Sequence, residues 1–239
     1  MNKFPVRLYS KFIYIMEDNT PHNQDPRVIS YLTLRKAVGI LGISLPVIVV
    51  VGSVIFGGCE GIQSSISNYY HTNMRNIFVG ILCAIALFLF AYKGYDKRDA
   101  FAGTMACIFA LGVAFFPTSL PEPLLPCMPY PFENQIISSI HFISAGGFFL
   151  VIAYFSIFLF TIKDENPTRM KLKRNKLYRI CSYIILGAIL LIAIYAICLR
   201  FNSCHGIQRY NPIFWLETIA LWAFGISWLT KGKAILVDK

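Results

Sequence analysis

Six long apolar runs restrict the fold of this chain more than any other feature. Each run is close to the ~20 residues that an α-helix needs to cross the ~30 Å hydrocarbon core of a bilayer. The runs are residues 38–57, 76–93, 100–117, 135–162, 178–199 and 212–230. The second and third are short, and the fourth is long enough to tilt or to protrude. The pattern predicts a polytopic membrane protein.

Composition and periodicity both favour helices over a β-barrel. The chain is 56% hydrophobic and only 14% charged. The first run, VGILGISLPVIVVVGSVIFG, lacks the alternation of apolar and polar residues that a lipid-facing strand requires. We therefore expect an all-α fold, a bundle of six transmembrane helices. The expected domains are a cytoplasmic N-terminal segment, a transmembrane domain and a cytoplasmic tail: residues 1–37, 38–231 and 232–239.

The distribution of basic residues predicts how the chain is threaded. Lys and Arg near helix ends stay in the cytoplasm. With the N-terminus placed there, both termini are cytoplasmic, and of the 22 basic residues only Arg75, Arg200 and Arg209 fall outside. Topology thus accounts for the net charge of +10, and we expect no nucleic-acid partner. The basic loop at residues 163–176 is a candidate surface for anionic lipid or for a protein partner.

Small and aromatic residues predict how the helices pack. Four alanines in the third run recur at a spacing of four: Ala102, Ala106, Ala110 and Ala114. Ser138, His141 and Ala145 share one side of the fourth run. Because small residues permit close approach in lipid, we expect these two helices to be neighbours. Trp215 and Trp228 lie near opposite ends of the sixth run, which is typical of interfacial aromatic belts.

Two ionisable side chains lie well inside apolar runs, and both are candidate functional residues. They are His141 and Glu217, each in the outer half of its predicted helix. A charge in hydrocarbon is costly unless it is neutralised, paired or hydrated, so such residues often mark functional sites. Glu60 and His71, in the stretch GGCEGIQSSISNYYHTNMRN, are expected on the same side. We therefore predict an outward-facing polar cavity with ligand-binding candidates Glu60, Ser67, His71, His141 and Glu217.

The same residues leave a catalytic alternative open. A serine nucleophile with a histidine base would use Ser64, Ser65 or Ser67 with His71 or His141. The catalytic candidates are Ser67, His71 and His141, although no GxSxG elbow is present. The sequence also lacks HExxH and any two histidines one helical turn apart, so no metal site and no cofactor is expected.

Three cysteines are predicted to lie outside the cytoplasm: Cys59, Cys127 and Cys204. In an oxidising compartment one disulfide among them is expected, although sequence does not fix the pairing. The chain has no CxxC, which disfavours a thiol oxidoreductase.

Two segments resemble a known family. They are SISNYYHTNMRNIFVGILCAIALFLFAYKGY (residues 65–95) and IHFISAGGFFLVIAYFSIFLF (residues 140–160). Both resemble the six-helix membrane family that includes the damage-regulated autophagy modulators, and also bacterial six-helix proteins of unknown function. The resemblance implies six helices with both termini cytoplasmic, and it implies no established catalytic residues. Where relatives often carry Gly or a small polar residue after Ser-Ile-Ser, this chain has Asn68, Tyr69, Tyr70 and His71.

Three functional hypotheses follow. The leading one is a non-enzymatic protein of the plasma membrane or a bacterial inner membrane that binds or moves a lipid or small amphiphile. The second is an intramembrane lipid hydrolase or transferase that uses Ser and His. The third is a membrane scaffold or signalling subunit that docks a protein partner at its basic cytoplasmic loop. Membrane lipids are the expected partners, and the sequence predicts no oligomeric state.

Overall fold

The computed structural model describes residues 31–92, 96–120, 127–161, 167–201 and 205–236. These residues form α-helices joined by loops, and no named strand occurs among them. The six α-helices are α2 (Tyr31–Gly57), α3 (Arg75–Phe90), α4 (Lys97–Phe115), α5 (Gln135–Tyr154), α6 (Arg169–Arg200) and α7 (Pro212–Lys231). Shorter elements are the 3-10 turns η1 (Ser67–His71) and η3 (His205–Tyr210), and the π-helical turn η2 (Phe155–Leu159) that continues α5.

Five of these helices are long and apolar enough to cross a membrane: α2, α4, α5 with η2, α6 and α7. The helical class predicted from the sequence is therefore confirmed, and the five helices are compatible with the predicted membrane protein. Helix α3 is apolar but has only 16 residues, or about 24 Å at 1.5 Å per residue. Its role as a sixth span stays a prediction.

Four helices begin before their apolar runs, α3 and α4 by a few residues at most and α2 and α6 by about two turns. Helix α2 starts at Tyr31, and α6 starts at Arg169, inside the basic stretch. Lys and Arg have good helix propensity, so charged residues can continue a helix beyond its apolar part. At the start of α6 the Thr168 hydroxyl caps the helix by accepting the Lys171 N–H at 3.1 Å. The apolar runs therefore located the helices but not their polar ends.

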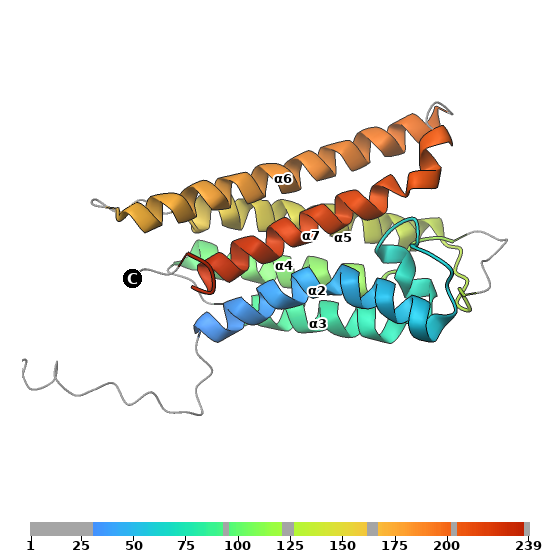
Figure 1. The fold of residues 1–239 in the computed structure, drawn as a ribbon, viewed down its shortest axis with the longest axis horizontal. Helices are drawn as coiled ribbons and strands as arrows, with labels where there is room; N and C mark the ends of the chain where they lie inside the picture. The colour runs from blue at the N-terminus through green and yellow to red at the C-terminus, as the bar shows by residue number, and fades with distance from the viewer. Residues whose placement is uncertain (1–30, 93–95, 121–126, 162–166, 202–204, 237–239) are drawn as a thin grey trace, which may run out of the picture. The chain divides into compact units, whose positions relative to one another are not determined.

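Each helix packs against its neighbours along the chain, and α2 also packs against α7, which closes a ring (Figure 1). Small residues line the contacts. A Cβ on Gly225 of α7 would lie 2.6 Å from the Gly39 carbonyl oxygen of α2, and one on Gly112 of α4 would overlap Ser144 of α5. The four alanines spaced along α4 are all buried. The prediction that α4 and α5 are neighbours is confirmed.

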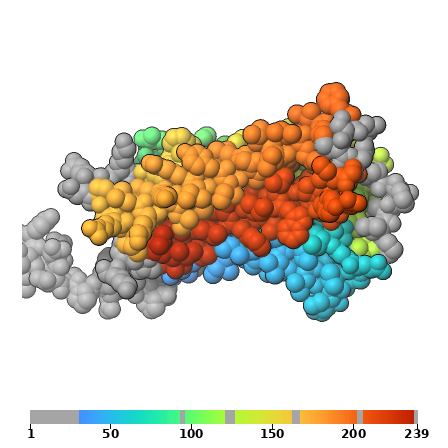
Figure 2. Space-filling model, turned by 45° about the horizontal axis from the view of Figure 1, so that its top comes forward, coloured from blue at the N-terminus to red at the C-terminus, as the bar shows by residue number. Residues whose placement is uncertain are grey.

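Helix α6 is the most exposed of the predicted spans, and it lies along α7 (Figure 2). Large apolar side chains cover its outward face, among them Leu190, Leu191 and Ile194. Its contacts with the other helices include a hydrogen bond from the Ser182 hydroxyl to the Ala153 carbonyl at 3.1 Å. An apolar exposed face with a few polar inward contacts is typical of a lipid-facing helix.

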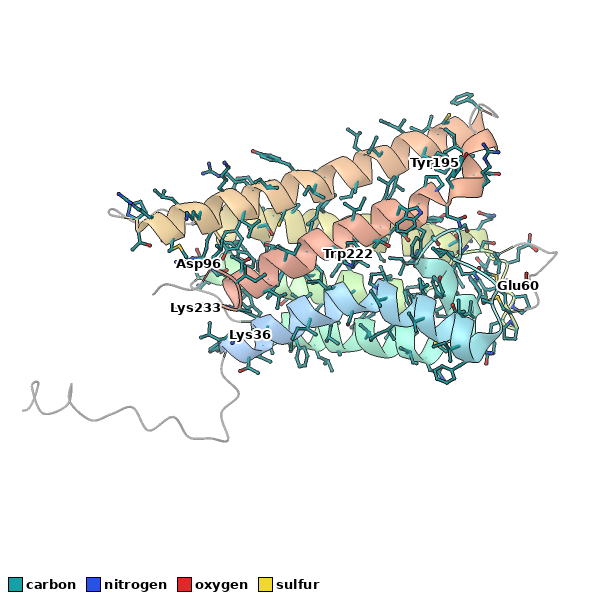
Figure 3. The ribbon with its side chains drawn as sticks, in the orientation of Figure 1. Lys36, Glu60, Asp96, Tyr195, Trp222 and Lys233 are labelled. Carbon is teal, nitrogen blue, oxygen red and sulfur yellow. A yellow bond between two sulfur atoms is a disulfide. The ribbon has the colours of Figure 1, made fainter. Side chains whose placement is uncertain are left out.

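One end of the helical array is rich in basic residues, among them those of the stretch RMKLKRNK at the start of α6 and Lys231 of α7. Lys36, Asp96 and Lys233 lie at the end where α2 begins and α7 ends, and Glu60 lies at the other end (Figure 3). We call these the basic end and the loop end. The loop end holds the connections after α2, α4 and α6.

An aromatic cluster fills the interior near the basic end. Tyr92, Phe155, Phe160 and Trp228 meet with ring centroids 5.2–5.8 Å apart. Trp228 is 1% exposed. The prediction that Trp228 belongs to an interfacial belt is therefore wrong, because neighbouring aromatic rings enclose it. Trp215 is exposed, as that prediction requires.

Candidate functional site

The segment between α2 and α3 is fixed at the loop end by three connections. A disulfide joins Cys59 to Cys127, in the connection between α4 and α5. The Asn211 side-chain amide donates to the Ile62 carbonyl at 3.1 Å, and the Phe214 N–H donates to the Ser64 carbonyl at 3.1 Å. The segment therefore folds over the ends of several helices.

The structure tests part of the prediction that one disulfide forms among Cys59, Cys127 and Cys204. Cys59–Cys127 is one of the three pairings left open, and Cys204 lies outside the described residues. Cys198, near the end of α6, is also disulfide-bonded. Cys83, Cys107 and Cys181 are free thiols within the helices.

The turn η1 owes its position to Tyr69, which is fully buried. Its hydroxyl accepts the Gln63 N–H at 3.3 Å, and its carbonyl accepts the Thr72 hydroxyl at 2.8 Å. Burial raises the pKa of the Tyr69 phenol, although its hydrogen bond to Gln63 acts in the opposite direction. The buried phenol anchors η1 and holds Ser67 on the inner side of the turn.

Glu217 of α7 connects the spanning helices to this turn. One oxygen of its carboxyl group accepts the Ile66 N–H at 2.6 Å. The contact joins segments 151 residues apart in the sequence. It also gives a hydrogen-bond partner to the Ile66 N–H, because a buried backbone N–H without a partner is costly.

Ser67 and His141 form a hydrogen bond of 2.9 Å between Oγ and Nε2. His141 Nδ1 lies 2.6 Å from the Phe116 carbonyl oxygen, which can only accept, so Nδ1 carries the proton. In the neutral imidazole Nε2 is then the acceptor, and the Ser67 hydroxyl donates to it. Phe116 caps α4 with an extended backbone, which frees its carbonyl for this contact.

His71 belongs to a separate hydrogen-bond group. It is fully buried, and its Nδ1 donates to the Tyr130 carbonyl at 2.8 Å. Its Nε2 lies 3.2 Å from the Thr118 hydroxyl, which is also 3.3 Å from the Asn68 side-chain oxygen. Burial is the main cause that lowers the pKa of His71, and the charge of Arg75 lowers it further. His71 thus holds the connection between α4 and α5 against η1.

A small pocket of about 40 Å³ lies between the helices, with Ser67 in its lining. Its polar side chains are Ser67 and Glu217, and the remaining lining is apolar. Five helices and the segment before α3 supply the lining: Leu45, Ile66, Ser67, Phe78, Leu82, Ala110, Val113, Ala145, Phe148, Phe149, Glu217 and Leu221. We call this the Ser67 pocket.

The predicted site residues separate into three groups. Ser67 and Glu217 line the Ser67 pocket. His141 is not part of the lining but forms a hydrogen bond with Ser67. His71 is buried but is not part of the lining, and Glu60 is exposed at the loop end (Figure 3). Of the two histidines considered as partners of Ser67, His141 forms the described hydrogen bond.

Two groups of the site are backbone atoms that sequence reasoning missed: the Ile66 N–H and the Phe116 carbonyl. Every residue has such atoms, so composition and spacing give no signal for them. Among the described residues, no three His, Cys, Asp or Glu side chains gather in a way that could hold a metal ion.

Comparison with known proteins gives no relative. No protein-family model, curated protein or solved structure matches the chain. The site must therefore be interpreted from its own chemistry.

Proposed function

We propose that this membrane protein binds a single-chain amphiphile in the Ser67 pocket. The observation that carries the proposal is a pocket with polar groups at one end and apolar side chains from five helices around the rest. Such a lining matches a ligand with one polar end and one apolar chain. The polar end would lie beside Ser67 and Glu217, and the chain would point toward Leu45, Phe148 and Leu221.

The size of the pocket limits the ligand. A volume of about 40 Å³ admits a few waters or one slender group, because a single water needs roughly 10–15 Å³. A branched or two-chain lipid would require the helices to separate. In this structure the pocket therefore has room for the first few carbons of an unbranched alkyl or acyl chain, and a longer chain would likewise require the helices to separate.

The hydrogen-bond roles limit the polar end as well. The Ser67 O–H already donates a hydrogen bond to His141, so toward the pocket the Ser67 oxygen can act only as an acceptor. The Glu217 carboxyl group, when ionised, also only accepts. Both groups favour a ligand that donates, such as a hydroxyl or an amide, and disfavour a free carboxylate or phosphate there.

The orientation in the membrane is part of the proposal. The basic end would face the cytoplasm with both termini, as the positive-inside rule favours, and α3 would be the sixth span. The disulfide at the loop end supports an oxidising compartment on that side. The ligand would then be an amphiphile of the extracytoplasmic leaflet. The resemblance to the autophagy-modulator family is compatible with this threading.

Native mass spectrometry of the purified protein tests the proposal. We expect a retained single-chain amphiphile in the wild type and its loss in Ala145→Phe, which places a large ring in the pocket lining. Ile143→Phe is the matched control, because Ile143 is exposed on the same helix. Absence of any retained or added amphiphile in the wild type, or equal retention in both variants, would refute the proposal.

A second candidate function rests on the Ser67–His141 hydrogen bond. In an acyl transfer, Ser67 Oγ would attack an acyl carbonyl while His141 Nε2 takes the hydroxyl proton. That proton would pass to the leaving alcohol or amine, and water or another alcohol would later release the acyl group. The Phe116 carbonyl would keep His141 in the required tautomer. Against this function, the nearby Ile66 N–H is already bonded to Glu217 and cannot stabilise an oxyanion.

Labelling with an alkyl fluorophosphonate distinguishes the two functions. A catalytic Ser67 predicts covalent labelling that is lost in Ser67→Ala and strongly reduced in His141→Gln. Ser64→Ala serves as control, because Ser64 is an exposed serine of the same segment. Binding alone predicts no labelling, with the amphiphile still retained.

A further inference from the structure

A second pocket lies at the loop end and shares no lining residue with the Ser67 pocket. It has a volume of about 300 Å³ and lies between η1, the start of α3 and the connection from α4 to α5. Arg75, Tyr70 and Tyr130 supply its polar groups, and Phe115, Phe116 and Ile137 form an apolar wall. We call it the Arg75 pocket.

The Arg75 guanidinium is held between two aromatic rings. Its central carbon lies 4.4 Å from the centroid of the Tyr70 ring and 5.4 Å from that of Tyr130. One N–H donates to the Tyr70 hydroxyl at 2.6 Å. Such contacts orient the guanidinium but leave its other N–H donors available, since an aromatic face does not replace a carboxylate.

The described contacts of Arg75 are with tyrosine rings and a hydroxyl group, and they include no acid. Among the described residues no Asp or Glu lies within ion-pair distance of it. The Tyr70 hydroxyl accepts from Arg75, so its own O–H remains a donor. The Tyr130 hydroxyl is a further possible donor. The polar groups of this pocket are thus mainly donors around one positive charge.

Hydrogen bonds and a disulfide join the described walls of this pocket to neighbouring segments. The Phe116 and Tyr130 carbonyls accept hydrogen bonds from His141 and His71 at 2.6 and 2.8 Å. The Leu120 N–H donates to the Phe132 carbonyl at 2.7 Å, and the disulfide ties Cys127 to Cys59. A rigid pocket loses little freedom on binding, which favours affinity.

We infer that the Arg75 pocket binds a phosphate group, with the Arg75 guanidinium and the Tyr70 hydroxyl as donors. Arginine presents a planar fork that matches phosphate oxygens in a bidentate way. The apolar wall, with exposed Phe115 and Phe116, suits the glycerol and upper chain of a phospholipid beside its headgroup. The phosphate could belong to a lipid or to a soluble ester, and the site does not depend on the ligand of the Ser67 pocket.

Two probes distinguish these sources, using the full chain purified in phosphate-free detergent. Inorganic phosphate is titrated by calorimetry, and phosphatidic acid is added in nanodiscs and followed by native mass spectrometry. A soluble source predicts binding of inorganic phosphate, and a lipid source predicts retention of phosphatidic acid alone. In either case we expect Arg75→Gln to abolish binding and Arg75→Lys to weaken it about tenfold, because lysine keeps the charge but loses the fork.

Arg209→Gln is the matched control. Arg209 also lies at the loop end over a tyrosine ring, 4.7 Å from the centroid of Tyr210, but it does not line the pocket. The Arg209→Gln variant should bind the phosphate probe as tightly as the wild type does. Tyr70→Phe keeps the ring and should weaken binding several-fold, which provides a test if Arg75→Gln does not fold. The inference is overturned if the wild type binds neither probe, or if Arg75→Lys and Tyr70→Phe both bind as tightly as the wild type.

Discussion

The Ile66 N–H donates to the Glu217 carboxyl group across 2.6 Å, and this bond joins the segment after α2 to the part of α7 near the loop end. It explains how an ionisable side chain within an apolar helix is accommodated. The carboxyl group meets a backbone donor at the polar end of a pocket and is not left in hydrocarbon. The same contact holds Ser67 beside the helices.

Glu217 should stabilise the loop end through this bond. We expect Glu217→Ala to lower the free energy of unfolding by about 1–3 kcal/mol, the usual cost of leaving a buried donor such as the Ile66 N–H without a partner. Glu217→Gln keeps an acceptor oxygen and should lose less. Thermal unfolding in detergent measures the difference, with Glu60→Ala as the control because Glu60 is exposed. Equal melting temperatures for Glu217→Ala and the wild type would show that the contact adds no stability.

His71 should make the protein sensitive to acid. Its folded-state pKa is lowered, chiefly by burial, so as pH falls the unfolded chain takes up the proton first. The stabilisation is complete above the ordinary pKa of about 6.5 and is lost as pH falls through the lower folded-state value. Melting temperatures between about pH 7.5 and 5 should therefore fall more steeply for the wild type than for His71→Gln. Parallel pH profiles would contradict this role.

Gly103 should be intolerant of a methyl group. A Cβ there would lie 2.6 Å from the Leu89 carbonyl oxygen of α3, which is backbone and cannot move away alone. We expect Gly103→Ala to destabilise the protein by about 1–3 kcal/mol through overpacking. Gly187→Ala in α6 meets open space and should be neutral or stabilising by up to about 1 kcal/mol. Thermal unfolding of both variants checks the contrast, and equal melting temperatures would argue against close packing of α3 and α4.

The Cys59–Cys127 disulfide should stabilise the loop end. It spans 68 residues of sequence, for which loop-closure entropy predicts about 4 kcal/mol as an upper figure. We expect reductant to lower the melting temperature of the wild type by several degrees. Without reductant the double variant Cys59→Ser/Cys127→Ser should melt several degrees below the wild type, and any further response of this variant to reductant reports the disulfide of Cys198. Alkylation after reduction shows whether the disulfide has opened. An unchanged melting temperature of the reduced wild type would then show that other contacts are enough to stabilise the loop end.

Much of the fold follows from the sequence because the bilayer imposes a simple rule. Apolar runs of about 20 residues located the helices, and the spacing of the alanines from Ala102 to Ala114 identified a buried face of α4. The same rule fails at helix ends, where Lys and Arg extend α6 and α2. It also failed for Trp228, because position along a helix does not reveal which face is enclosed.

The candidate site was predictable only in part, for a physical reason. His141 and Glu217 stood out as ionisable groups within apolar runs, and Ser67 was one of three nearby serines. The bonds that organise them use backbone atoms of Ile66 and Phe116, whose positions depend on how the loops fold. His71 was the other candidate partner for Ser67, yet it bonds to Tyr130 and belongs to another hydrogen-bond group. The protein partner expected at the basic loop stays a prediction.

Photo-crosslinking with a short-chain alkyl alcohol that carries a diazirine tests the central claim most directly. With the hydroxyl beside Ser67 and the chain in the pocket, labelled peptides should contain pocket residues of α2 and α5 such as Leu45 and Phe148. Labelling there should be lost in Ala145→Phe and kept in Ile143→Phe. Labelling confined to exposed positions such as Ile143 and Leu150, and unchanged in Ala145→Phe, would contradict binding in the Ser67 pocket.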